Sequence, residues 1–278
     1  MKRLLVTGGS GYLGGFLTAA AAAKWQTAFT WLSHPVSIEG AAGARLDIMD
    51  EDAVLRLFRE FRPDAVVHTA YSQKDLTVID RGTENIVRGC DLTGSRLVHL
   101  STDAVFDGEH SWYRETDKPE PVHDYGNAKL RSERIVDSSG VYRQGKGVIL
   151  RTSLVWGLAP IDPRTLFIRE KLEKAEKLVL YDDEYRCPIR VDELAAAIVE
   201  LLAVDFSGII HIAGPERLNR YDFGLMLARS QGWNEKGITA GPSSLSGTVR
   251  PRDCSLDTTL ARKMLRTRIL APRVLLGI

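Results

Sequence analysis

A tyrosine and a lysine four positions apart, Tyr125 and Lys129, are the residues of this sequence best placed for proton transfer. If Tyr125 opens a helix, Lys129 lies one turn further along the same face, and its ammonium can approach the phenol. A nearby cation favours the phenolate, so we expect the pKa of Tyr125 to fall from about 10 by roughly 1–3 units. The tyrosine could then deliver or accept a proton close to neutral pH.

Hydroxyl groups precede this pair, at the end of a predicted strand. Ser101 and Thr102 close that strand, and Asp103 follows them directly. A hydroxyl at this point can polarise a carbonyl oxygen, and together with a hydride donor and a proton source it completes the parts that reduction of a ketone needs. Asp103 has two interpretations that stay open: it belongs to the site, or it caps the turn after the strand.

A glycine-rich turn lies where the first predicted strand passes into the first predicted helix. Gly8 permits the tight turn, Gly11 lets the backbone approach a pyrophosphate, and Gly14 allows close packing of helix on strand. The helix N-terminus then offers free N–H groups and the positive end of its dipole to the phosphates. The sequence therefore predicts a dinucleotide site at this turn. Its residues are Gly8, Ser10, Gly11, Tyr12, Leu13 and Gly14.

The end of the second predicted strand indicates which nicotinamide cofactor is bound. A carboxylate about 20 residues after the glycine turn bonds the ribose hydroxyl of NAD, whereas an arginine nearby accommodates the 2′-phosphate of NADP. Here Ser33 and His34 follow the strand, no carboxylate comes before Glu39, and no arginine stands at the expected place. A hydroxyl and an imidazole can donate to a phosphate, so we expect NADP(H), with NAD(H) as the alternative. His34 could equally be an ordinary surface residue.

Composition disfavours several classes of function. The 278 residues carry 37 Lys and Arg against 36 Asp and Glu, a formal net charge of +1, so no general positive field exists for binding nucleic acid or a membrane. The cysteines Cys90, Cys187 and Cys254 lie far apart, which disfavours disulfides and structural zinc and is typical of a cytoplasmic protein. We expect no metal site, no nucleic-acid partner and no membrane partner.

Short apolar segments alternate with amphipathic segments of helical length, a pattern typical of a parallel sheet covered on both faces. We therefore predict an α/β fold with a doubly wound parallel sheet of the Rossmann type. Asp50 is the expected N-cap of one helix. The predicted strands are 3–7, 28–32, 44–47, 65–68, 97–101, 148–154 and 209–212. The predicted helices are 12–24, 51–61, 76–90, one beginning near 124, 164–177, 191–202 and 221–231.

The alternation weakens after Gly157, which indicates a second, smaller unit. We expect a dinucleotide-binding domain formed by residues 1–157 and about 187–213. Residues 158–186 and 214–278 would form a small C-terminal substrate-binding lobe, which ends in an irregular tail after residue 231.

The order of these motifs, from glycine turn to strand-end hydroxyls to Tyr-x-x-x-Lys, resembles the extended short-chain dehydrogenase/reductase family. Four segments are similar to its dTDP-4-dehydrorhamnose reductase branch: Ser-Thr-Asp-Ala-Val-Phe-Asp-Gly at 101–108, Tyr-Arg-Glu-Thr-Asp-Lys-Pro at 113–119, Arg-Thr-Ser at 151–153 and Arg-Pro at 250–251. Gly-Thr-Glu-Asn at 82–85 resembles the structural helix motif of the family, and Asp-Ile at 47–48 resembles its adenine-contacting pair.

The resemblance implies a role for each candidate residue. Thr102 would bind the substrate carbonyl, Tyr125 would be the acid, and Lys129 would orient the ribose of the cofactor and tune the tyrosine. The further cofactor-binding positions are Asp47, Ile48 and Ala70, and the substrate-binding positions are Asp103, Tyr71 and Arg250.

Several candidates have ordinary structural alternatives. Arg250 and Arg252 would hold a nucleotide diphosphate by charge-assisted bonds, or they pair with Asp253 or Asp257 at the surface. Tyr71 and Trp156 could line a sugar pocket, although aromatic residues at strand ends more often serve packing. His68 is expected to be a buried histidine with its hydrogen bonds satisfied.

Two departures from the reductase pattern concern the substrate. Ala104 replaces a tyrosine, and Leu154 stands where those reductases carry a tryptophan, so the sugar and the base stay open. The residue after Asp103 is not the glutamate of the sister dehydratases, which argues against that activity.

These observations predict NADPH-dependent reduction of the 4-keto group of a nucleotide-linked deoxysugar by an NAD(P)-dependent oxidoreductase. One alternative is an NAD-dependent sugar-nucleotide epimerase of the same family. The other is a non-catalytic NADP-binding protein that resembles the regulatory subunit of methionine adenosyltransferase. The resemblance also admits a homodimer.

Overall fold

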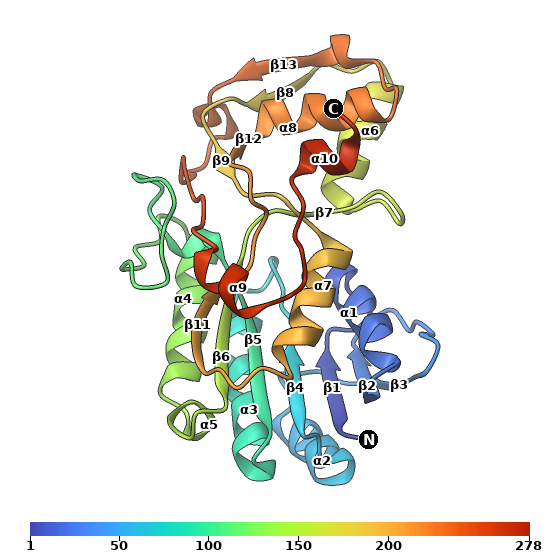
Figure 1. The fold of residues 1–278 in the computed structure, drawn as a ribbon, viewed down its shortest axis with the longest axis vertical. Helices are drawn as coiled ribbons and strands as arrows, with labels where there is room; N and C mark the ends of the chain where they lie inside the picture. Colours follow the sequence, from blue (N-terminus) through green and yellow to red (C-terminus); the bar gives the residue numbers. More distant parts are fainter.

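Seven parallel strands form the main sheet of the computed structural model, which describes residues 1–278 (Figure 1). Their order is β11-β6-β5-β4-β1-β2-β3, and every neighbouring pair is parallel. The chain therefore winds outward from β1 in both directions, which confirms the predicted fold. The strands are β1 (Arg3–Thr7), β2 (Gln26–Trp31), β3 (Ala41–Arg45), β4 (Ala65–His68), β5 (Arg96–Thr102), β6 (Gly147–Thr152) and β11 (Gly208–His211).

Helices cover both faces of this sheet because successive side chains of a strand point to opposite sides. Leu4 and Val6 of β1 lie in one apolar core, and Leu5 between them lies in the other. α1 (Tyr12–Ala22) and α7 (Val191–Leu201) cover the first face. The second face is covered by α2 (Glu51–Phe61), α3 (Thr77–Thr93), α4 (Asp124–Asp137) and α5 (Gly140–Arg143).

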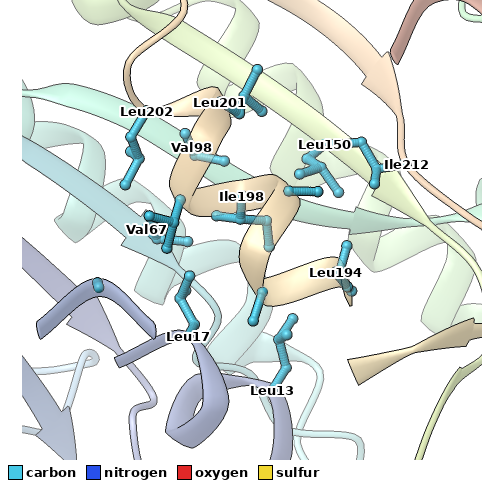
Figure 2. Packing of buried hydrophobic residues seen from close by; sticks show 14 of the residues in the cluster. Leu13, Leu17, Val67, Val98, Leu150, Leu194, Ile198, Leu201, Leu202 and Ile212 are labelled. Carbon is cyan, nitrogen blue, oxygen red and sulfur yellow. The ribbon is translucent and has the colours of Figure 1, made fainter. Parts of the chain in front are cut away.

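Figure 2 shows the first core at close range. Leu17 of α1 and Ile198 of α7 meet Val67, Val98 and Leu150 of the strands, and all five side chains are fully buried. Each such side chain contributes about 1.5–3 kcal/mol relative to exposure. This packing fixes α1 against the sheet, and with α1 the glycine turn at its N-terminus.

Local capping sets the bounds of α2 as the sequence predicts. The Asp50 carboxylate accepts a hydrogen bond from the N–H of Ala53 at 2.9 Å, which satisfies one of the free donors of the first turn. Arg62 ends the helix in the left-handed conformation with φ of 49°. None of the protein's helices has the combination of length and apolar character that crossing a bilayer requires.

A smaller group of elements lies beyond one end of the main sheet (Figure 1). Trp156, Ile168, Leu218, Phe223 and Leu227 belong to its separate apolar core. Its strands are paired as β7 (Val155–Trp156) with β10 (Ile189–Arg190), β9 (Tyr185–Arg186) with β12 (Leu218–Asn219), and β8 (Leu178–Tyr181) with β13 (Ile238–Gly241). Its helices are α6 (Pro163–Glu173), α8 (Arg220–Ser230) and α10 (Pro272–Leu276). We propose that this group, apart from β7 and β10, is the substrate-binding lobe, with the bounds that the sequence predicts.

The prediction of an irregular tail after residue 231 is wrong. β13 pairs in parallel with β8, Ile238 opposite Leu178. α9 (Thr259–Met264) and α10 follow it, and α9 contributes Ala261 to the main core. These elements are short and depend on distant partners, so local periodicity does not reveal them.

Candidate active site

The glycine turn adopts the conformation that its sequence predicts. Gly8 has φ of +75°, and a Cβ there would lie 2.8 Å from the Cα of Ala70, so only glycine fits. A Cβ on Gly14 would lie 2.1 Å from the carbonyl oxygen of Gly8, which explains the close approach of helix and turn. A Cβ on Gly11 would have only one neighbour within 4 Å, the carbonyl oxygen of Gly8 at 3.1 Å. The outer side of the turn is therefore open to a ligand backed by N–H groups.

Two further residues of the turn serve it in different ways. Leu13 is buried in the main core, so its side chain is unavailable and only its backbone can contact a ligand. The Tyr12 hydroxyl donates to the carbonyl oxygen of Pro160 at 2.9 Å, and a Cβ on Gly157 would collide with that hydroxyl at 2.2 Å. Tyr12 thus joins the turn to the segment that leads into α6.

The segment after β3 is held from beneath by α3. Ile48 is buried against Gly82, where a Cβ would lie 2.3 Å from the isoleucine Cδ1. The side-chain amide of Asn85 donates to the Ile48 carbonyl oxygen at 2.9 Å. Asp47 is exposed, and its carboxylate accepts from the N–H of Met49 at 2.9 Å. The motif at 82–85 therefore positions the predicted adenine-contacting pair.

An arginine that the sequence analysis missed lies beside the end of β2. Ser33 and His34 are exposed there, and Arg45 of the neighbouring β3 donates from its Nε to the carbonyl oxygen of Leu32 at 3.3 Å. The expectation that no arginine stands at this place is wrong, because the arginine comes from the next strand rather than from the residues after β2. No residue pattern near the end of β2 indicates it, because the register of Trp31 opposite Arg45 is seen only in the structure.

Local contacts present Tyr125 beside Thr102. His123 caps α4, its Nδ1 accepting from the N–H of Gly126 at 2.9 Å. A Cβ on Gly126 would lie 2.2 Å from the carbonyl oxygen of Ala104, in the 3-10 turn η1 (Asp103–Val105). The start of α4 therefore docks directly on the turn that follows Thr102.

The expected lowering of the Tyr125 pKa is wrong for this state of the protein. Burial raises the pKa of Tyr125 above its ordinary value, Tyr71 and Asp103 raise it further, and these effects outweigh Arg164 and the Thr102 hydroxyl, which lower it. Lys129 does not assist the phenol, because its Nζ donates to the carbonyl oxygen of Leu100 at 2.6 Å. Tyr125 is therefore a protonated phenol at neutral pH.

Lys129 itself is desolvated. Only 5% of the residue is exposed, and burial lowers its pKa to about 8, although Glu133, one helical turn further on, raises it. Its Nζ also lies 5.9 Å from the ring centroid of Tyr71, and the Tyr71 ring lies 6.1 Å from that of Tyr125. The structure thus brings the predicted Tyr71, Tyr125 and Lys129 together.

Asp103 is part of the interior of the site rather than a cap. Its buried carboxylate accepts from Thr102 Oγ1 at 3.1 Å and from Ser153 Oγ at 2.6 Å, and lies 3.6 Å from Arg186 Nε. The cap of η1 is Thr102, whose Oγ1 accepts from the N–H of Ala104 at 3.2 Å. Burial raises the pKa of Asp103, although Arg186 and the two hydroxyls lower it.

A buried ion pair joins the elements that carry the site. Arg151 of β6 binds both carboxylate oxygens of Glu133 on α4, at 3.0 and 2.7 Å. Ser101, the neighbour of Thr102, donates to the same carboxylate. Because both charged side chains are at most 4% exposed, the pair fixes the spacing between α4 and the end of β5. The sequence analysis did not identify Glu133 as part of this arrangement.

The smaller lobe supplies a group of arginines, Arg164, Arg186, Arg220 and Arg250, which we call the arginine cluster. Three of them surround the buried carboxylate of Glu184, with Arg250 Nε at 2.5 Å, Arg186 Nη2 at 3.4 Å and Arg220 Nε at 3.8 Å. Burial raises the pKa of Glu184, but these arginines hold it below the ordinary value. Arg164 forms no ion pair with Glu184, but its positive charge lowers the pKa of both Tyr125 and Arg220.

The predicted alternative partners of Arg250 are wrong. Asp253 pairs with Arg217 at 2.6 Å, and Asp257 lies 4.0 Å from Arg114. Arg250 instead turns inward to Glu184.

Two other candidates have the structural roles that the sequence analysis allowed. Trp156 is 2% exposed and packs on Phe223 with ring centroids 5.6 Å apart, so it belongs to a core. His68 is buried and hydrogen-bonded to Thr7 Oγ1 at 2.7 Å, as expected.

The parallel sheet, the open glycine turn and the side chains at the strand ends define a protein of the Rossmann-type extended short-chain dehydrogenase/reductase class. More particularly, the chain belongs to the family described as the RmlD substrate binding domain, whose model matches residues 1–273.

Curated relatives include both a probable reductase and a subunit of methionine adenosyltransferase 2. The chain is 31% identical over 196 residues to a probable low-salt glycan biosynthesis reductase, Agl14, of Haloferax volcanii, and the match covers 65% of this chain and 64% of that protein. It is 28% identical over 291 residues to the methionine adenosyltransferase 2 subunit beta of Xenopus laevis, covering 95% of this chain and 82% of that protein.

Solved structures agree on the fold. A hypothetical dTDP-4-dehydrorhamnose reductase from Sulfolobus tokodaii superposes with a TM-score of 0.85 at 29% identity, covering 97% of each chain. The dTDP-4-dehydrorhamnose reductase of Bacillus anthracis, solved in complex with NADP, gives a TM-score of 0.81 at 21% identity, over 100% of this chain and 98% of that one.

Proposed function

We propose that the protein is an NADPH-dependent reductase that converts the 4-keto group of a nucleotide-linked deoxysugar into a hydroxyl. The observation that carries this proposal is the convergence of Thr102, Tyr125 and Lys129 at the carboxyl end of the sheet that also presents the glycine turn. The docking of Gly126 on the Ala104 carbonyl holds the tyrosine and the threonine together.

The residues present fit a nicotinamide dinucleotide. The turn from Gly8 to Gly14 has an open outer side beneath the N-terminus of α1, and the backbone of Ala70 lies directly against it. In our proposal the turn holds the pyrophosphate, the segment at 47–48 contacts the adenine, and Lys129 with Tyr125 faces the nicotinamide ribose. When bound, the cofactor supplies the hydride.

Tyr125 is suited to be the acid in this reaction. Because burial keeps its pKa above the ordinary value, it reaches the substrate still carrying the proton that the alkoxide oxygen needs. The Thr102 hydroxyl, which donates to Asp103 in this structure, can turn to donate to the substrate oxygen. Lys129 places a positive charge near the developing negative charge, and water is largely excluded from its surroundings.

The arginine cluster supports a nucleotide-linked substrate. Arg186, Arg220 and Arg250 face Glu184, and Arg186 also faces Asp103, so the guanidinium groups outnumber the two carboxylates that they contact. A diphosphate carries negative charge in oxygen atoms that match the planar guanidinium fork. We therefore propose that Arg250 and its neighbours hold the diphosphate while the sugar reaches Tyr125 and Tyr71.

The test is a screen of nucleotide-linked 4-keto-6-deoxysugars with the purified protein, following the loss of NADPH absorbance. We expect turnover with at least one of them and formation of the 4-hydroxy sugar nucleotide. Tight NADPH binding without turnover of any keto-sugar nucleotide would contradict the proposal.

A second candidate function is a non-catalytic regulatory subunit. It is favoured by the long alignments with methionine adenosyltransferase 2 subunit beta, which cover 92–95% of this chain. Co-purification with a methionine adenosyltransferase from the native cells, together with an absence of reductase turnover, would support this function over the first.

A further inference from the structure

The exposed guanidinium of Arg45 is the strongest unassigned feature near the glycine turn. Its Nε donates to the Leu32 carbonyl oxygen at 3.3 Å, and this is its only hydrogen bond. No carboxylate pairs with it, and both terminal nitrogens of the guanidinium are left without a protein partner. Two other exposed arginines, Arg88 and Arg131, lie in ion pairs with Glu51 and Asp80, whereas the exposed Arg59 forms none.

The position of Arg45 is set by the sheet. β2 and β3 run parallel with Trp31 opposite Arg45, and the N–H of Leu46 donates to the Trp31 carbonyl oxygen at 2.9 Å. The Arg45 side chain therefore extends from β3 to the end of β2, next to the exposed residues Ser33 and His34.

The same end of β2 touches the glycine turn. The N–H of Gly8 donates to Thr30 Oγ1 at 3.3 Å, and the N–H of Gly9 donates to the Thr30 carbonyl oxygen at 2.8 Å. In a Rossmann fold a dinucleotide whose pyrophosphate lies on this turn extends its adenosine ribose toward the end of the second strand. Arg45 lies at that end, on the neighbouring strand and opposite Trp31, the residue that follows Thr30.

We propose that Arg45 makes the protein select NADPH over NADH by binding the 2′-phosphate of the adenosine ribose, with Ser33 and His34 as additional donors. A guanidinium fork with free terminal nitrogens matches the oxygens of a phosphate. No carboxylate stands between Trp31 and Glu39 to accept the ribose hydroxyls of NADH or to repel the phosphate. The inference rests on the proposed function, because it requires the glycine turn to bind a nicotinamide dinucleotide.

The test compares Arg45→Gln with Arg59→Gln. Both residues are exposed and both changes remove one positive charge, but Arg59 lines a groove with Arg3 and Asp64 at the amino end of the strands. Affinities for NADPH and NADH are measured by isothermal titration calorimetry on the full chain, and thermal unfolding checks that each variant is folded.

We expect the wild type and Arg59→Gln to bind NADPH more tightly than NADH. In Arg45→Gln the affinity for NADPH should fall by about ten- to hundredfold while that for NADH changes by less than about threefold. A wild type that prefers NADH, an Arg45→Gln variant that keeps the preference, or an equal loss for both nucleotides would overturn the inference. If the wild type bound neither nucleotide, the result would instead contradict the proposed function itself.

Discussion

Lys129 directs its amine at the carbonyl oxygen of Leu100, 2.6 Å away, and not at the phenol of Tyr125. The lysine is thereby tied to the strand that ends in Thr102, so the helix and the strand that carry the site are joined through it. Burial then affects the two side chains differently. It raises the pKa of Tyr125, which stays protonated, and it lowers the pKa of Lys129 to about 8.

Replacing Tyr125 by phenylalanine should remove the acid and leave the rest of the site intact. We expect turnover with a keto-sugar nucleotide to fall about 100- to 10,000-fold, with NADPH affinity and melting temperature nearly unchanged. Tyr221→Phe, on α8 in the smaller lobe, is the matched control and should keep full turnover. Because the pKa of Tyr125 is raised, the wild-type rate should show no loss from deprotonation of this residue between pH 7 and pH 9.

Lys129 should make the stability of the protein depend on alkaline pH. Its pKa falls from 10.5 to about 8 on folding, so the folded state binds fewer protons than the unfolded state between these values. Stability linked to this group therefore rises as pH rises through the interval. Relative to Lys129→Met, the wild type should gain about 3 kcal/mol between pH 7 and pH 10.5. Urea unfolding of both proteins at each pH measures it, and a constant difference would contradict the assignment.

An apolar pair should be able to replace the Glu133–Arg151 pair for stability, but not for the geometry of the site. Glu133→Gln leaves Arg151 buried without its counter-charge and should cost about 3–5 kcal/mol of unfolding free energy. The double variant Glu133→Leu, Arg151→Met should regain most of that loss, since an apolar pair can replace a buried ion pair. Its turnover should stay low because Ser101 and α4 are no longer joined. Full activity in the stable double variant would show that the pair does not position the site.

Two adjacent glycines of α1 should respond in opposite ways to alanine. At Gly14 the added Cβ would lie 2.1 Å from the Gly8 carbonyl oxygen, so the turn must move and NADPH affinity should fall. At Gly15 the nearest atom is the Gly9 oxygen at an ordinary 3.6 Å, and alanine should stabilise the helix by up to about 1 kcal/mol. Calorimetric titration and thermal unfolding measure both effects. Equal behaviour of the two variants would contradict the described packing of the turn.

Arg250→Ala should weaken binding of the nucleotide-linked substrate. We expect KM for the sugar nucleotide to rise about ten- to hundredfold with a much smaller change in kcat, because the residue contacts the diphosphate in ground and transition states alike. The control is Arg229→Ala, which breaks an exposed pair with Glu235 on the same lobe. A loss confined to kcat would instead place Arg250 near the reacting atoms.

Features that depend on neighbouring residues were predictable from the sequence. The Asp50 cap, the positive φ of Gly8, the start of α4 and the strand β4 with its exact bounds all follow from local backbone preferences and hydrophobic periodicity. The same signals placed Thr102 at the end of a strand and Tyr125 and Lys129 on the helix that follows it.

Other features were decided only by the tertiary structure. Arg45 reaches the end of β2 because of strand register, and Glu184 gathers Arg186, Arg220 and Arg250 from positions far apart in the chain. The direction of the Tyr125 pKa depends on burial, which no spacing of residues reports. Sequence patterns record short-range conformational preferences, whereas desolvation and charge contacts are set by the side chains that folding brings together from distant segments.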